Sequence, residues 1–131
     1  MSAKKDLVHP PDLKYSEEHE WVRVEDGEAV VGITDYAQDQ LGDVVFVELP
    51  AVGDTVQQFK TFGVVESVKA ASDLFAPVSG EVVASNDSLL NQPELVNQSP
   101  YEGAWLIRVR MSDAAELDKL LDREAYEQLL H

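Results

Sequence analysis

Short runs of β-forming residues, closed by glycine, proline or aspartate, are the feature that most restricts how this chain can fold. Asp26-Gly27 separates two of these runs and is a strong signal for a two-residue hairpin turn. Many short strands at close spacing predict an antiparallel sandwich or barrel rather than a helical or α/β fold. In chain order, the runs lie at residues 21–24, 29–33, 44–49, 62–68, 74–76, 81–84 and 105–111.

Two internal segments have helix signals. Thr34 or Asp35 is a suitable N-cap for a short helix that ends at Leu41, and Gly42 suits a left-handed exit from it. Residues 93–97 begin with proline, which favours the first position of a helix, and they predict a single helical turn.

The C-terminal segment, about 113–130, is predicted to contain short helices. Asp113 and Glu116 have the spacing of a capping box, in which each side chain bonds the backbone of the other residue. Leucines recur at helical spacing over 117–121, and the same spacing resumes after Asp122. The segment therefore predicts two short helices in succession.

One folded domain is expected over residues 14–131, preceded by a flexible leader over residues 1–13. Its apolar content of 44% is ordinary for a globular protein. We predict that the core includes Trp21, Val31, Ile33, Phe46, Val82, Trp105 and Ile107.

Charge and cysteine content exclude several kinds of function. The formal net charge of −15 disfavours nucleic acid and anionic membranes as partners, and favours proteins with basic surfaces. The chain has no cysteine, so neither thiolate chemistry nor a disulfide framework is available to it. His9, His19 and His131 are far apart in the sequence, and no metal site is predicted. No apolar run is long enough to span a membrane.

Lys69 stands between two β-rich runs, among the small residues Ala70, Ala71 and Ser72. A solvated surface charge is one interpretation. A Schiff-base lysine is a second, but it usually requires a desolvated pocket, which these neighbours do not predict. A third is covalent modification, because small neighbours let an acylating enzyme reach the amine. Lipoamide and biotin are group carriers attached in this way.

Blocks along nearly the whole chain, from Lys14 to about Leu130, resemble the glycine cleavage system H protein family. No one block is decisive, but their occurrence in this order is specific. They are Lys14-Tyr15-Ser16, His19-Glu20-Trp21, Gly32-Ile33-Thr34, Ala37-Gln38, Leu41-Gly42-Asp43, residues 45–50, residues 66–73, residues 76–82, residues 93–97, Ser99-Pro100-Tyr101 and Gly103-Ala104-Trp105.

The resemblance implies a mainly β fold: a flattened antiparallel barrel-sandwich hybrid of the lipoyl/biotinyl type, with short helices and a C-terminal helical segment. It also implies that Lys69 carries lipoate in amide linkage, added by a lipoyl or octanoyl transferase or a lipoate ligase. The protein is then a shuttle and not an enzyme. A pyridoxal-phosphate glycine decarboxylase loads the aminomethyl group. A tetrahydrofolate-dependent aminomethyltransferase takes it, and dihydrolipoamide dehydrogenase reoxidises the arm.

Further site residues follow from the resemblance. Glu66 and Asp73 are expected to help present the hairpin, the alternatives being an exposed strand face and a turn-favouring aspartate. Glu20 is a candidate for holding the aminomethyl ammonium, the alternative being a solvated carboxylate in a loop. His19 is expected to be structural. Relatives often carry histidine where this chain has Tyr36, which bears on the cleft that shelters the arm.

Other functions remain open at this point. The chain can instead be a lipoate relay for other lipoyl enzymes, a biotinyl carrier or an unmodified acidic adaptor. Biotin-accepting hairpins typically place methionine on both sides of the lysine, whereas Val68 and Ala70 flank Lys69 here. We expect a monomer in the bacterial cytoplasm. The mitochondrial matrix is less favoured, because the N-terminus does not resemble a transit peptide.

Overall fold

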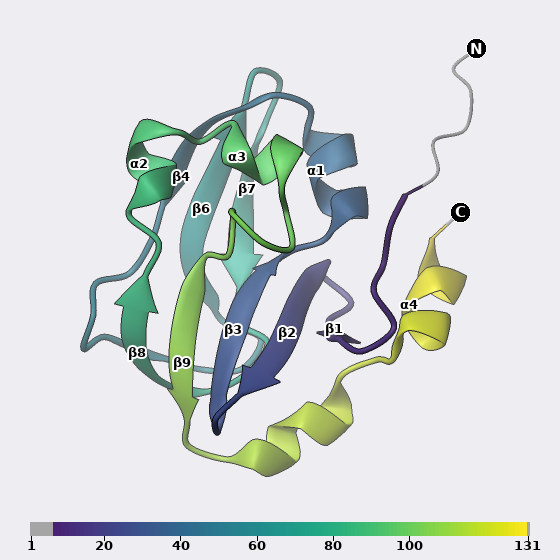
Figure 1. Cartoon of the computed structure of the whole chain (residues 1–131), viewed down its shortest axis with the longest axis vertical. Coiled ribbons are helices and arrows are strands. Elements are labelled where there is room, and N and C mark those ends of the chain that lie inside the picture. Colours follow the sequence, from purple (N-terminus) through teal and green to yellow (C-terminus); the bar gives the residue numbers. More distant parts are fainter. Residues whose placement is uncertain (1–6, 131) are drawn as a thin grey trace.

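The computed structural model describes residues 7–130, which form two antiparallel sheets with short helices around them (Figure 1). The larger sheet has the strand order β1-β2-β3-β9-β8-β5, and the smaller has the order β4-β6-β7. Within residues 7–130 no strand of one sheet pairs with a strand of the other, so the sheets form a sandwich and not a closed barrel. The predicted mainly β class, with two antiparallel sheets and short helices, is confirmed.

Of the nine strands within residues 7–130, seven overlap the predicted runs, whereas the two-residue strands β1 and β5 were not predicted. In the larger sheet they are β1 (Lys14–Tyr15), β2 (Glu20–Glu25), β3 (Glu28–Ile33), β5 (Thr55–Val56), β8 (Gly80–Ser85) and β9 (Ile107–Met111). In the smaller sheet they are β4 (Val44–Glu48), β6 (Thr61–Ser67) and β7 (Ala71–Phe75).

The turn between β2 and β3 shows why the local signal was reliable. Asp26 has a φ of 52° and Gly27 a φ of 78°. Positive values at both central residues are those of a type I′ turn, whose twist matches that of the flanking strands. The predicted hairpin is therefore confirmed.

Helices close the two ends of the sandwich. Thr34 caps the helix α1 through its side chain, which accepts a hydrogen bond from the Ala37 amide, and the chain leaves this helix at Gly42. Near α1, at the top of Figure 1, lie two single-turn helices, while the C-terminal helices run along the opposite end and one side. The helices are α1 (Asp35–Leu41), α2 (Ser88–Asn91), α3 (Leu95–Gln98), the 3₁₀ helix η1 (Ala114–Lys119) and α4 (Arg123–Leu129).

The predicted capping box at the start of η1 is only half correct. Asp113 accepts a hydrogen bond from the Ala115 amide, as an N-cap residue does. Glu116 does not reach back to Asp113. Its carboxylate accepts hydrogen bonds from both the amide and the hydroxyl of Ser79, at 2.7 and 2.8 Å. Glu116 therefore attaches η1 to the turn before β8 instead of closing the cap.

Most of the predicted core is confirmed, with two corrections. Phe46 is 45% exposed, because a β-bulge in β4 turns it outward, and Trp105 is only half-buried. The confirmed members are Trp21, Val31, Ile33, Val82 and Ile107.

Part of the predicted flexible leader is instead packed against the domain. Leu13 and His9 are buried, and the amide of Val8 donates a hydrogen bond to Asp35. His9 also lies 3.1 Å from the carboxylate of Glu127 in α4. The segment from residue 8 onward is thus packed onto α1 and α4. The rest of the predicted leader, residues 1–6, and His131 lie outside the described residues.

Candidate functional site

Lys69 lies in the turn between β6 and β7, which projects at the top of Figure 1. Ser67 holds this turn: its amide donates to the Ala70 carbonyl at 2.7 Å, and its hydroxyl oxygen accepts from the amides of Lys69 and Ala70. A serine that bonds the backbone two and three residues ahead is a common turn device. The Lys69 side chain is exposed, as covalent modification requires. Ser67 is a site residue that the sequence analysis missed.

A second contact fixes the turn relative to α1. The amide of Val68 donates to the carbonyl of Asp43 at 3.0 Å, which joins the turn to the loop between α1 and β4. Gly42 has a φ of 78°, and a Cβ added there would lie 3.6 Å from the Cε atom of Lys69. The Lys69 stem therefore passes beside the end of α1.

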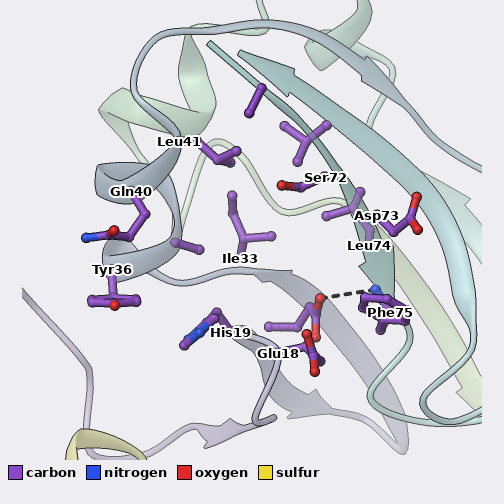
Figure 2. Close-up of a pocket in the computed structure, with 14 residues that line it drawn as sticks. Glu18, His19, Ile33, Tyr36, Gln40, Leu41, Ser72, Asp73, Leu74 and Phe75 are labelled. Atoms are coloured by element: carbon purple, nitrogen blue, oxygen red, sulfur yellow. Dashed lines mark hydrogen bonds between the residues drawn. The ribbon is translucent and has the colours of Figure 1, made fainter. Parts of the chain in front are cut away.

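A cleft of about 480 Å³ lies between α1 and β7, next to this turn (Figure 2). Ala70 and Ser72 line the cleft within three residues of Lys69, and Leu41 and Leu74 give it apolar walls. Its lining also includes a group of polar side chains from the segment before β2 and from β2 itself: Glu18, His19 and Glu20.

Glu20 is a strand residue and is 1% exposed, so its interpretation as a solvated carboxylate in a loop is wrong. One carboxylate oxygen accepts a hydrogen bond from the Ser16 hydroxyl at 2.6 Å. The other accepts from the amide of Phe75 in β7 at 3.1 Å, the dashed line in Figure 2. Burial raises the pKa of Glu20 to about 8, and these hydrogen bonds oppose the rise only in part. Glu20 thus joins the two sheets beside the cleft.

His19 is held by the C-terminal helix. Its Nδ1 lies 2.8 Å from the hydroxyl of Tyr126, which also lies 2.8 Å from the hydroxyl of Thr34. Burial lowers the pKa of His19. Because Thr34 caps α1, Tyr126 connects two walls of the cleft. The sequence showed Tyr126 only as an apolar residue at helical spacing, and nothing in it pointed to this contact.

Tyr36 does lie in the cleft, beside His19, with a distance of 4.9 Å between the ring centroids. Tyr36 therefore forms part of the cleft wall and does not lie on a remote surface. Figure 2 shows the Tyr36 ring on the α1 side of the cleft, close to His19.

The two remaining predicted residues, Glu66 and Asp73, differ in their relation to the cleft. Asp73 lines the cleft together with Glu20, whereas Glu66 is not among the lining residues. Both are exposed strand residues, so the interpretation of Asp73 as a turn residue is wrong. Among residues 7–130, no three histidine or acidic side chains are grouped in a way that could hold a metal ion.

Two antiparallel sheets that present an exposed lysine on a tight hairpin turn define a class of proteins that carry a group on a lysine side chain. The family model described as glycine cleavage H-protein matches residues 13–131. The chain therefore belongs to the glycine cleavage H-protein family.

Individual relatives agree with this assignment. Glycine cleavage system H proteins of Bacillus cereus strain AH820 and Bacillus anthracis strain A0248 are each 59% identical over 120 residues, which cover 92% of this chain and 94% of theirs. The crystal structure of a glycine cleavage system H protein from Mycobacterium marinum matches with a TM-score of 0.85 and 39% identity, and the match covers 92% of this chain and 97% of that one.

Family membership establishes the general role. The chain is a lipoyl-bearing shuttle of the glycine cleavage system, and it is a carrier protein rather than a catalyst. Family membership therefore favours the lipoyl shuttle over two of the alternatives, the biotinyl carrier and the unmodified adaptor. No helix within residues 7–130 is long and apolar enough to cross a membrane.

Proposed function

We propose that Lys69 is the residue that carries lipoate. The observation that supports this most directly is its exposure on a turn held by Ser67 and Asp43, beside the cleft. In the modification, the neutral amine attacks the carbonyl carbon of an activated lipoyl or octanoyl donor. A carbon–nitrogen bond forms, the donor's leaving group departs and the amine loses a proton. The formal net charge changes from −15 to −16, because one positive charge is lost.

The residues around Lys69 fit a lipoyl group. When bound, lipoate supplies a dithiolane, which provides the sulfur chemistry that this cysteine-free chain lacks. The cleft begins beside the turn, and Leu41 and Leu74 offer apolar contact to an acyl chain. Its volume of about 480 Å³ is within the range of small-molecule sites.

Glu20 is proposed to hold the ammonium of the aminomethyl cargo, because it lines the cleft. Burial raises the pKa of Glu20 to about 8, so the carboxyl group is largely protonated at neutral pH, and a nearby cation stabilises the ionised form. Arrival of the cationic cargo would therefore release a proton from Glu20. Glu66 and Asp73 are proposed to help present the hairpin, from the face of the sheet that points away from the core.

The partners follow from the same role. We propose that Lys69 and its arm visit the pyridoxal-phosphate glycine decarboxylase, the tetrahydrofolate-dependent aminomethyltransferase and dihydrolipoamide dehydrogenase. A lipoyl or octanoyl transferase or a lipoate ligase modifies Lys69. The net charge of −15 favours partners with basic docking surfaces. We expect the protein to act as a monomer in the bacterial cytoplasm.

Intact-mass measurement of protein from a lipoate-competent host tests the attachment site. The wild type should gain the mass of one lipoyl group, which differs from that of biotin. Lys69→Arg should gain nothing and should not support glycine-dependent turnover, because a guanidinium is not an acceptor. Lys60→Arg is the matched control, since Lys60 is an exposed lysine near the opposite end of β6. An unmodified wild type, or a modified Lys69→Arg, contradicts the proposal.

A further inference from the structure

Phe46 is exposed by the backbone of β4. The register between β4 and β6 shifts between Val44 and Phe46, which is the mark of a β-bulge. As a result Val45 and Phe46 are both exposed, while their neighbours Val44 and Val47 are buried. A bulge commonly redirects a side chain, and here it brings an aromatic ring to the surface near the functional hairpin.

Strand register places Phe46 on a defined surface. Phe46 is opposite Glu66 and Glu66 is opposite Ala71, while Val64 lies between Glu48 and Asp73. Residues directly opposite each other in a sheet have side chains on the same face. We call this surface the outer face, and its members are Phe46, Glu48, Val64, Glu66, Ala71 and Asp73.

The outer face is strongly acidic. Glu48, Glu66 and Asp73 are exposed, and none of them has an ion pair or a side-chain hydrogen bond to another of residues 7–130. Glu66 is a diagonal neighbour of both Glu48 and Asp73, so like charges lie close together on the sheet. Cationic groups of a partner would relieve this repulsion, and the exposed aromatic ring offers such a partner an apolar anchor.

We propose that the outer face is the docking site for the enzyme that acylates Lys69. That enzyme presents an apolar pocket to Phe46 and lysine or arginine side chains to Glu48, Glu66 and Asp73. The inference rests on the proposed function of Lys69. It adds to that function the surface by which the acylating enzyme recognises the unmodified protein.

The acylating enzyme is the partner that most needs this surface. Before modification there is no arm to recognise, so the protein around Lys69 must distinguish this lysine from others. Glu66 lies only three residues from Lys69 on the same strand and turn. The cleft lies mainly against inward-pointing residues such as Val65 and Leu74, and Asp73 is the one outer-face residue that also lines it. An enzyme on the outer face therefore reaches the edge of the cleft at Asp73 and not its inner walls.

Initial rates of acylation of the unmodified protein test the proposal, with a purified lipoate–protein ligase, lipoic acid and ATP. Phe46→Ala should lower kcat/KM by about tenfold, mainly through KM, as expected for loss of an interface anchor. Phe46→Leu should recover part of the loss. Phe59→Ala is the matched control. Phe59 is a similarly exposed aromatic residue, at 48%, but it lies just before the start of β6, at the end of the strand far from Lys69.

The charges are tested separately. Glu48→Gln should lower kcat/KM and weaken its dependence on salt, because one attractive charge is lost. Equal urea midpoints for the variants and the wild type would show that the fold is retained.

The outcomes distinguish docking from attachment. If the wild type is acylated on Lys69 and Phe46→Ala is acylated with the same kcat/KM, the docking proposal is overturned while the attachment site stands. It is also overturned if Phe46→Ala is acylated normally and only its later reduction by the decarboxylase is slowed, since the face then serves another partner. If the wild type is not acylated on Lys69, the proposed function itself fails.

Discussion

Replacing Glu20 with glutamine should make the stability of the protein less sensitive to pH. The unfolded carboxyl group ionises near 4.5, whereas burial raises the pKa of the folded group to about 8. Between these values the folded state binds one more proton than the unfolded state. The free energy of unfolding therefore falls as pH rises, by about 1.4 kcal/mol per pH unit.

The size of the effect is accessible to measurement. From about pH 5 to about pH 7.5, the wild type should lose roughly 3 kcal/mol of stability relative to Glu20→Gln. Glutamine imitates the protonated acid: its carbonyl oxygen can accept from the Phe75 amide, and its NH₂ group can donate to the Ser16 hydroxyl. The two positions it must satisfy are those that Glu20 already bonds, at 3.1 and 2.6 Å.

Urea unfolding at a series of pH values, followed by tryptophan fluorescence, provides the assay. Trp21 is buried and directly follows Glu20, so its emission should report loss of the native fold. Other titrating groups contribute to both proteins and cancel in the difference. Glu102→Gln, the same substitution at an exposed turn position outside the cleft, is the matched control. If the free energy of unfolding of Glu20→Gln changes with pH in the same way as that of the wild type, burial does not keep the Glu20 carboxyl group protonated.

Two substitutions test the packing around the cleft. Tyr126→Phe removes the hydroxyl between His19 and Thr34, and should lower the free energy of unfolding by about 1–3 kcal/mol, measured by urea denaturation. An unchanged midpoint would show that the bridge adds nothing. Gly32→Ala would place a Cβ against the ring of Trp21 and should cost about 1–3 kcal/mol, with an altered near-UV circular dichroism spectrum. A spectrum and midpoint equal to those of the wild type would contradict the predicted clash.

Local sequence signals predicted the elements whose causes are local. The Asp26-Gly27 turn and the Thr34 cap depend on residues close in the chain, and both form as expected. Local signals could not predict that the side chain of Phe46 lies on the exposed face of its sheet. Residues 44–47 are an unbroken apolar run, without the alternation that distinguishes inner from outer residues, and a bulge then shifts the register.

Long-range contacts account for the other errors at the site. Glu20 bonds the amide of Phe75, which is 55 positions away, and this contact buries a carboxylate that looks solvated in the sequence. Glu116 likewise bonds Ser79, 37 positions away, in preference to its local capping partner. The turn that holds Lys69 was predictable because small residues separate two β-rich runs, whereas its contact with Asp43 depends on the fold.

The exposure of Lys69 on one short turn also has a kinetic consequence for the proposed cycle. Two enzymes cannot enclose the same side chain at once, so each must dissociate before the next can bind. Very tight binding to any of them would sequester the carrier and stall the cycle. Short residence times are therefore expected on every enzyme, so affinity should come from fast association rather than from slow release.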